Sequence, residues 1–270
     1  MKKLGVIGHP IGHSLSPQIH QAFSLQTGVE LTYEPIDMKE FNFTANLLDL
    51  VEKGFNGLNV TLPLKGCAYG SADIKSEECN LVKAANTLHF IDKQILAYST
   101  DGKGFARDLK DKNLKVPGKH ILMIGAGGSA RSILPSLLSM KPMSLSIINR
   151  TKHKAAILAK EFSNEQILIT GGGLDAAHDK YDAIINTSSF EAEGSKLHIN
   201  KNAFKSAEWT YDLMYSKINK TKFVSLSNQL GVEESYDGFG MLICQAALSF
   251  EIWTGVQPEI TNVSKEIFLD

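Results

Sequence analysis

A glycine-rich turn is the clearest chemical signal in the chain. The apolar run Ile121-Leu122-Met123-Ile124 leads directly into Gly125-Ala126-Gly127-Gly128-Ser129-Ala130, a G-x-G-x-x-A pattern. In such a turn the first glycine permits the sharp bend, the second lets the backbone approach a pyrophosphate, and the alanine keeps the helix close to the sheet. The unpaired N–H groups at the helix start then face the anion. The pattern predicts a dinucleotide site; the alternative is a strand-to-helix turn with a structural role only.

The end of the next predicted strand indicates which dinucleotide is bound. An NAD site usually carries Asp or Glu there, which accepts hydrogen bonds from the ribose hydroxyls. This chain has Ile148-Asn149-Arg150-Thr151-Lys152-His153-Lys154, without an acidic residue. Arg150 could pair with a 2′-phosphate, and Lys154, one helical turn later, could add a second positive charge. We therefore expect NADP as the cofactor; the alternative is an ordinary solvated start of a basic helix.

Two clusters of polar residues near predicted strands suit a small polar ligand. Ser14 and Ser16 follow the first predicted strand and precede a helix, where two hydroxyls suit a carboxylate. Ser16 could equally be only a helix N-cap. Asn59 and Thr61 point to the same side of a strand because side chains alternate along it.

A lysine and an aspartate could carry proton transfer. Lys65 follows Asn59-Val60-Thr61-Leu62-Pro63-Leu64, and Asp101 follows Asn86-Thr87 and Ser99-Thr100 along the chain. Taken singly, Lys65 could be a solvated surface charge and Asp101 a helix cap. If both reach one pocket, they suit proton transfer beside a carbonyl that accepts a hydride.

Gln245 is an amide on a predicted helix face that is otherwise apolar, with Met241, Leu242, Leu248 and Ile252. A buried amide needs hydrogen-bond partners. A ligand with several hydroxyl groups would supply them, and a hydrogen bond to the protein backbone is the alternative.

The elements expected around these residues alternate between strands and helices, which is the pattern of an α/β protein with mainly parallel sheets. The predicted strands are 4–8, 31–37, 57–61, 86–91, 94–99, 119–125, 144–149, 167–170, 181–186 and 209–213. The strands 86–91 and 94–99 flank Asp92-Lys93, which predicts a hairpin there. The predicted helices are 16–27, 41–53, 129–139, 152–162 and 238–254, with a joining segment near 102–118 and a local turn at Gly171-Gly172-Gly173.

Composition excludes several classes of protein. The 270 residues contain 28 Lys and Arg against 29 Asp and Glu, a balance that indicates no nucleic-acid partner. Three cysteines without C-x-x-C spacing argue against a disulfide framework. The apolar stretches are too short for a signal peptide or a membrane span, so a cytoplasmic protein is expected. His9, His13 and His20 lack the spacing of a metal site, and no metal is expected.

Six motifs in sequence order resemble those of the shikimate dehydrogenase family over nearly the whole chain. The resemblance is carried by Val6-Ile7-Gly8 with Ser14–Pro17, Asn59-Val60-Thr61 with Pro63 and Lys65, Asn86-Thr87 with Thr100-Asp101-Gly102, Gly125–Arg131, Asn149-Arg150-Thr151, and Asp237–Leu242 with Gln245-Ala246-Ala247 and Trp253-Thr254-Gly255.

The resemblance implies NADP-dependent reduction of 3-dehydroshikimate to shikimate, in aromatic amino-acid biosynthesis. Lys65 and Asp101 would form the catalytic pair, with Lys65 as proton donor. Ser14 and Ser16, with Thr61 and Tyr215 nearby, would hold the carboxylate, while Asn59, Asn86, Asp101 and Gln245 would bind the ring hydroxyls. The cofactor residues would be Gly125, Ala126, Gly127, Gly128, Ser129, Ala130, Asn149, Arg150, Thr151, Lys154, Thr187, Ser188, Leu213, Gly238 and Met241.

The resemblance also implies two lobes with a cleft between them. Residues 1–101 and 238–270 would form an α/β substrate domain with a mainly parallel sheet, and residues 102–237 a Rossmann-type NADP-binding domain. The expected partner is a small-molecule substrate, with no nucleic acid and no membrane, and the protein would be a monomer or a homodimer. Two alternatives stay open: a quinate/shikimate dehydrogenase with relaxed cofactor choice, and a non-catalytic regulator that binds shikimate or NADP.

Overall fold

The chain folds into two compact units. The computed structural model describes residues 1–270 except 189, 191–198, 262, 264–266 and 268–270. Unit 1 consists of Met1–Gly104 with Leu242–Asp270, and unit 2 of Phe105–Met241. Both boundaries lie in the first turn of a helix.

Unit 1 is built on a six-stranded sheet of order β2-β1-β3-β5-β6-β4. The pairings β1–β2, β1–β3 and β4–β6 are parallel, and β3–β5 and β5–β6 are antiparallel. The sheet is therefore mixed, with the predicted hairpin as its antiparallel part. Its strands are β1 (Lys2–Gly8), β2 (Leu31–Asp37), β3 (Gly57–Val60), β4 (Ile74–Lys75), β5 (Thr87–Ile91) and β6 (Gln94–Tyr98).

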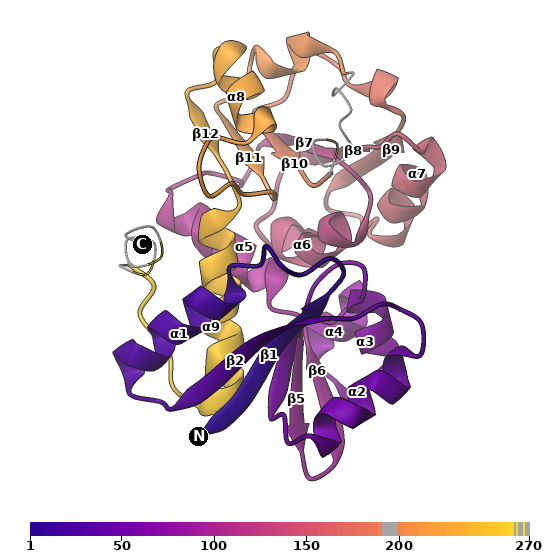
Figure 1. Ribbon diagram of the computed structural model, residues 1–270. Helices are drawn as coiled ribbons and strands as arrows, with labels where there is room; N and C mark the ends of the chain where they lie inside the picture. Colours follow the sequence, from indigo (N-terminus) through magenta and orange to yellow (C-terminus); the bar gives the residue numbers. More distant parts are fainter. Residues whose placement is uncertain (189, 191–198, 262, 264–266, 268–270) are drawn as a thin grey trace. The chain divides into compact units, whose positions relative to one another are not determined.

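Helices cover both faces of this sheet (Figure 1). On one face lie α1 (Ser16–Thr27) and α9 (Phe239–Thr254), and on the other α2 (Phe43–Glu52), α3 (Lys65–Ser71) and α4 (Glu77–Val82). Leu58 and Val60 belong to the apolar core under α2 and α3. Because side chains alternate along a strand, Gly57 and Asn59 face α9. A Cβ on Gly57 would lie 2.2 Å from Trp253 Nε1, so glycine allows α9 to approach the sheet.

Unit 2 is a doubly wound parallel sheet. Its strand order is β12-β11-β10-β7-β8-β9, and all of its pairings are parallel. Counted from β7, this is the order 3-2-1-4-5-6 of dinucleotide-binding folds. The strands are β7 (His120–Ile124), β8 (Ser144–Ile148), β9 (Leu168–Gly172), β10 (Ala183–Asn186), β11 (Trp209–Asp212) and β12 (Glu234–Tyr236).

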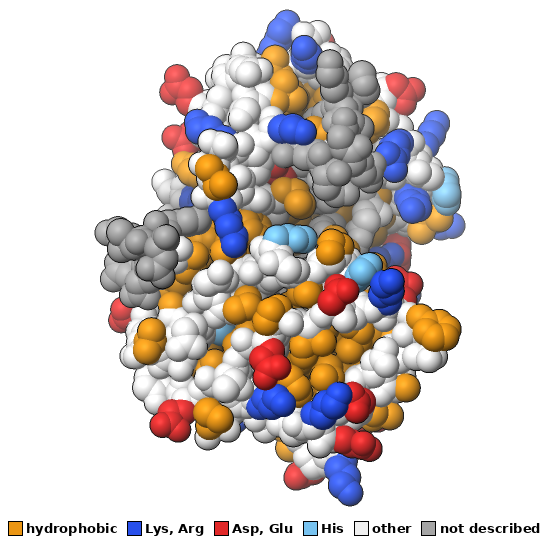
Figure 2. All heavy atoms as spheres, viewed as in Figure 1, with side chains coloured by type: hydrophobic (Ala, Val, Ile, Leu, Met, Phe, Trp, Pro, Cys, Tyr) orange, Lys and Arg blue, Asp and Glu red, His pale blue; other side chains and the backbone are white. Residues whose placement is uncertain are grey.

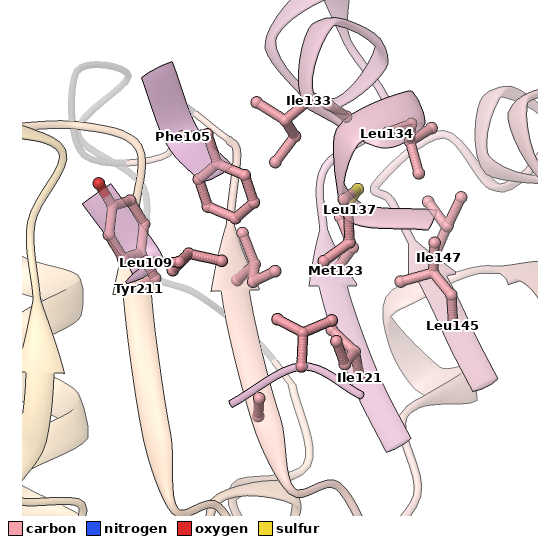
Figure 3. Close-up of a cluster of buried hydrophobic side chains, with 14 of the residues drawn as sticks. Phe105, Leu109, Ile121, Met123, Ile133, Leu134, Leu137, Leu145, Ile147 and Tyr211 are labelled. Atoms are coloured by element: carbon pink, nitrogen blue, oxygen red, sulfur yellow. The ribbon is translucent and has the colours of Figure 1, made fainter. Parts of the chain in front are cut away.

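Apolar side chains cover both faces of the second sheet, as a parallel sheet requires. Along β7, Ile121 and Met123 pack into one core while Leu122 and Ile124 pack into the other. Figure 3 shows the first core, where Phe105 and the β7 side chains lie between the sheet and its helices. The helices of this unit are α5 (Asp101–Asp111, from Phe105 on), α6 (Gly128–Ser139), α7 (Lys152–Glu161) and α8 (Lys222–Gln229).

Several elements differ from the sequence predictions. The expected joining segment at 102–118 contains helix α5, which the glycines at 102 and 104 conceal in the sequence. Gly171 and Gly172 belong to strand β9, so the expected local turn is wrong there. A Cβ on Gly171 would lie 2.4 Å from the Ala155 carbonyl oxygen, which shows that the glycine serves close packing of α7 on β9. The sequence pattern did not predict α3, α4 and β4, because they are too short for a clear periodicity, nor did it predict α8 and β12.

Candidate functional site

Lys65 and Asp101 meet in unit 1. Lys65 is the first residue of α3 and Asp101 the first residue of α5. The Lys65 Nζ atom lies 2.6 Å from Asp101 Oδ2, and the two side chains are 17% and 8% exposed. A short bond between an ammonium and a carboxylate in a mostly buried place is strong and directional. The carboxylate holds the ammonium in a fixed position, from which it can donate a proton.

A buried amide cluster surrounds the second oxygen of Asp101. Asn86 Nδ2 lies 3.0 Å from Asp101 Oδ1, 3.0 Å from Gln245 Oε1 and 2.7 Å from Thr100 Oγ1. Gln245 Nε2 donates to the Leu242 carbonyl at 2.8 Å, so the backbone hydrogen bond considered as the alternative for Gln245 is present. The structure thus brings Asn86 and Gln245 to Asp101, as expected for residues of one site.

Ser14, Ser16 and Thr61 lie at the carboxyl ends of neighbouring strands. Ser16 is the first residue of α1 and is buried, and its N–H donates to Ser14 Oγ at 3.2 Å. The expected role of Ser16 as N-cap is therefore wrong, because Leu15 holds that position and Ser14 supplies the hydroxyl. Thr61 directly follows β3 and is half-buried.

Asn59, which the resemblance implies as a contact for a ring hydroxyl, is bonded to protein groups on all sides. It is buried, and its Oδ1 accepts from Tyr33 Oη at 2.7 Å and from His20 Nε2 at 3.1 Å. Its Nδ2 faces the Asn86 carbonyl oxygen at 3.1 Å, Thr87 Oγ1 at 3.3 Å and Ser249 Oγ at 3.0 Å. An amide has two donors and two acceptor positions. Protein groups occupy all of them, so Asn59 holds other residues in place.

His20 is a buried titratable group that the sequence analysis did not assign to the site. Burial lowers its pKa from 6.5 to about 3, against the opposing effect of the hydrogen bond to Asn59. His20 therefore stays neutral in the folded protein at neutral pH. The spacing in the sequence could have indicated that His20 lies near the site, since His20 comes four residues after Ser16 and so lies on the same face of α1.

The neutral His20 predicts a stability loss in acid. The unfolded chain binds a proton at His20 with an ordinary pKa near 6.5, whereas the folded protein does so only near 3. Stability from this group is complete above about pH 6.5 and falls as the pH decreases, by about 2 kcal/mol at pH 5. Urea unfolding at pH 7.5 and pH 5 measures this loss in wild type and in His20→Gln. Wild type should lose about 2 kcal/mol more than the variant, and equal losses would contradict a buried neutral imidazole.

The glycine turn of unit 2 has the expected shape. Gly125 directly follows β7 with φ +107°, and a Cβ there would lie 2.4 Å from Thr187 Oγ1. Gly127 precedes α6 as its N-cap, and a Cβ on it meets nothing within 4 Å. Gly128 and Ser129 open the helix, Ala126 is half-buried, and Ala130 is fully buried against the core. The turn leaves open space in front of the helix N-terminus, where a pyrophosphate fits.

The end of β8 presents the predicted basic residues. Asn149 Nδ2 donates to the Thr151 carbonyl at 3.0 Å, which closes the turn into α7. Thr151 is the N-cap of α7, and Arg150 and Lys154 are exposed. Cations at a helix start are unfavourable for the helix dipole unless an anion is bound there. The arrangement therefore fits a phosphate group.

The remaining predicted cofactor residues follow β10, β11 and β12. Asn186 Oδ1 accepts from the Ser188 N–H and hydroxyl, and Asn186 Nδ2 donates to Asp212 Oδ1 at 2.9 Å. These bonds tie the ends of the two strands together. Three of the other expected residues of unit 2 are held by hydrogen bonds: Thr187 Oγ1 donates to the Ile124 carbonyl, Leu213 N to the Asn186 carbonyl and Gly238 N to the Met214 carbonyl. Met241 is buried in the core, and Tyr215 is half-buried beside Phe239.

The structure therefore groups the predicted residues by unit. The catalytic pair and the substrate residues, except Tyr215, belong to unit 1, and Tyr215 and the cofactor residues belong to unit 2. In unit 2, the glycine turn, the basic turn and the residues after β10 and β11 all follow the carboxyl ends of adjacent parallel strands. Ligands of doubly wound sheets bind at that edge.

The part of the chain that the structure describes contains no group of three or more His, Cys, Asp or Glu side chains that could hold a metal ion. Within the same residues, every helix is too short or too polar to cross a membrane. On the face shown in Figure 2, positive and negative side chains are interspersed with uncharged ones.

Three family models match the chain. The model of the shikimate dehydrogenase substrate binding domain matches residues 6–88. The model of shikimate / quinate 5-dehydrogenase matches residues 108–210, and that of the shikimate 5'-dehydrogenase C-terminal domain matches residues 238–267.

Curated relatives and solved structures match nearly the whole of this chain. The shikimate dehydrogenase (NADP(+)) of Legionella pneumophila subsp. pneumophila is 40% identical over 267 residues, 99% of this chain and 98% of the relative. The Ael1 enzyme of Pseudomonas putida has a TM-score of 0.90 and 32% identity, over 99% of this chain and 98% of its own. The shikimate 5-dehydrogenase of Thermus thermophilus, solved with NADP(H) and shikimate, has a TM-score of 0.86 and 28% identity, over 99% and 98% of the two chains.

Proposed function

Because the chain belongs to the shikimate dehydrogenase family, we propose that it catalyses the reversible NADP-dependent reduction of 3-dehydroshikimate to shikimate, in aromatic amino-acid biosynthesis. The observation that carries the proposal is the 2.6 Å contact of Lys65 with Asp101 inside the amide cluster. A relative of this length and identity that is named for the reaction supports the same conclusion.

Unit 1 would bind the substrate. Ser14 and Ser16 would hold the carboxylate, helped by Thr61. The ring hydroxyls would be bound by Asn86, Asp101 and Gln245, whose polar atoms already converge in unit 1. Asn59 would hold Asn86 in position without contacting the substrate, because its hydrogen-bonding groups are occupied within the protein.

Unit 2 would bind NADP. The open space at Gly127 suits the pyrophosphate, and Arg150 with Lys154 suits the 2′-phosphate. Thr187, Ser188 and Leu213 would line the nicotinamide. When bound, the reduced cofactor supplies the hydride that adds to the carbonyl carbon.

Lys65 would complete the reduction. Hydride addition places negative charge on the carbonyl oxygen, and an ammonium near that oxygen stabilises the charge and donates a proton to it. The C=O π bond breaks while one C–H bond and one O–H bond form, which gives the alcohol. Asp101 keeps the ammonium in position through the bond to its Oδ2. In the reverse direction, neutral Lys65 accepts the hydroxyl proton.

The assay of the proposed reaction is direct. Purified protein with NADPH and 3-dehydroshikimate should oxidise NADPH, and with NADP⁺ and shikimate should form it, as absorbance at the nicotinamide band measures. Parallel assays with NAD⁺ and with quinate separate a relaxed quinate/shikimate dehydrogenase from the proposed enzyme. Binding of shikimate or NADP⁺ without turnover would instead indicate the non-catalytic regulator. We further propose that the protein is cytoplasmic and that it is a monomer or a homodimer. Size-exclusion chromatography with light scattering measures the molar mass and so tests the oligomeric state.

A further inference from the structure

A buried polar cluster lies behind the amide cluster of unit 1, between the sheet and the helices α1 and α9. Its centre is Asn59 on β3, whose amide orientation follows from one contact. The Asn86 carbonyl can only accept, so the Asn59 atom 3.1 Å from it is Nδ2. Asn59 Oδ1 then faces His20 Nε2 and Tyr33 Oη, and both of these groups must donate to it. His20 therefore carries its proton on Nε2.

Aromatic rings hold His20 in this neutral tautomer. The imidazole stacks on Tyr33 with ring centroids 4.4 Å apart and planes 9° apart, and it also contacts the rings of Phe23, Phe250 and Trp253. Its Nδ1 is buried and has no hydrogen-bond partner among the described residues. A buried polar atom without a partner has a cost in free energy. Packing alone would favour an apolar side chain here, so the Nε2 donor has a role of its own.

The donor is connected to the catalytic pair through two amides. His20 bonds to Asn59 at 3.1 Å, and Asn59 Nδ2 bonds to the Asn86 carbonyl at 3.1 Å. The Asn86 side chain then donates to Asp101 Oδ1 at 3.0 Å, while Asp101 Oδ2 holds Lys65. Each link lies within unit 1 and is buried or nearly so.

We propose that His20 is a positioning residue for the reaction, which acts through Asn59 and Asn86 on the Asp101–Lys65 pair. The proposal rests on the proposed function. Without a donor at the Nε2 position, Asn59 Oδ1 keeps only the Tyr33 hydroxyl, and one of the bonds that fix the Asn59 amide is lost. The Asn86 carbonyl also accepts from the Val60 N–H at 2.8 Å, so Asn86 loses part of its support, and Asp101 holds the ammonium less precisely.

Two matched substitutions test the role of the donor. Gln places its amide nitrogen where the His Nε2 lies, whereas Asn reaches only the Nδ1 position. His20→Gln and His20→Asn both remove the imidazole ring, so they share the loss of aromatic packing. We expect kcat/KM for shikimate to fall about threefold in His20→Gln and about tenfold in His20→Asn, roughly the effect of one lost buried hydrogen bond. The KM for NADP⁺ should stay within about twofold in both, since unit 2 contains its proposed site.

A second pair of variants keeps the test decisive if the His20 variants fold poorly. Tyr33→Phe removes the other donor to Asn59, together with the hydrogen bond between Tyr33 and the Ser16 side chain, and keeps the stacked ring. Tyr98→Phe is the same substitution at a half-buried tyrosine of the same unit outside the cluster. Tyr33→Phe should lower kcat/KM for shikimate about five- to tenfold, and Tyr98→Phe should stay within about twofold. Equal values for His20→Gln and His20→Asn, or for the two tyrosine variants, would overturn the proposal. Wild-type turnover tests the proposed function separately, because it does not depend on any variant.

Discussion

Lys65→Ala is expected to lower kcat for 3-dehydroshikimate reduction by about 10²- to 10⁴-fold, the range for loss of a positioned general acid. The substitution removes the ammonium that lies 2.6 Å from Asp101 Oδ2, and no other cation is bonded to that carboxylate within the described residues. The oxygen of the substrate then develops its charge without a proton donor. Stopped-flow or steady-state NADPH absorbance measures kcat, and the KM for NADPH should stay within about twofold.

Lys103→Ala is the matched control for Lys65. Lys103 lies on α5 two residues after Asp101, is exposed, and pairs with Glu78. An exposed ion pair contributes little, so this variant should keep turnover within about twofold of wild type. If Lys65→Ala retained turnover within about threefold of wild type, Lys65 would not be the proton donor.

Arg150→Ala is expected to raise the KM for NADPH by about 10- to 100-fold, the loss of a charge-assisted bond to the 2′-phosphate. The kcat at saturating NADPH should change little, because Arg150 is assigned to the adenosine end and not to the reacting carbonyl. The kcat/KM for NADH should stay nearly constant, since NADH has no 2′-phosphate. The preference for NADPH over NADH should therefore shrink by the same factor.

Lys160→Ala controls for a general loss of positive charge. Lys160 lies in the last turn of α7, whereas Arg150 precedes the first turn of the same helix. Its removal should leave the KM for NADPH within about twofold. Higher salt should also raise the wild-type KM for NADPH, because Arg150 is exposed and its pairing is screened. An unchanged ratio of NADPH to NADH efficiency in Arg150→Ala would contradict the assigned role.

Local sequence was sufficient for the glycine turn of unit 2. The run from Ile121 to Ala130 predicts the strand, the turn and the helix because each depends on neighbouring residues. Apolar residues that favour β-structure form the strand, Gly125 with φ +107° forms the turn, and the helix begins with residues that are not β-branched. The alternation of strands and helices also predicts a mainly parallel sheet, since parallel neighbours need a crossover connection that a helix can supply. The strand β12 escaped prediction because three residues carry too little periodicity.

The hairpin shows how far local sequence reaches into the site of unit 1. Asp92 and Lys93 have positive φ values, and the register pairs Ile91 with Gln94 and Thr87 with Tyr98. That register places Asn86, which precedes β5, beside Thr100 and Asp101, which follow β6. A tight two-residue turn sets the register of its strands, so the predicted hairpin already implied this part of the site.

The sequence by itself determined the glycine turn after β7, the basic turn after β8 and the hairpin. Turn geometry and side-chain alternation depend on near neighbours, so local sequence is enough to predict them. Only the tertiary structure decided that Lys65 reaches Asp101, that Gln245 reaches Asn86, and that Asn59 is enclosed by His20 and Tyr33. These contacts join segments that are distant in the chain. They form when apolar faces of helices bury against the sheet, and that driving force is non-directional, so residue spacing does not encode which polar groups it brings together.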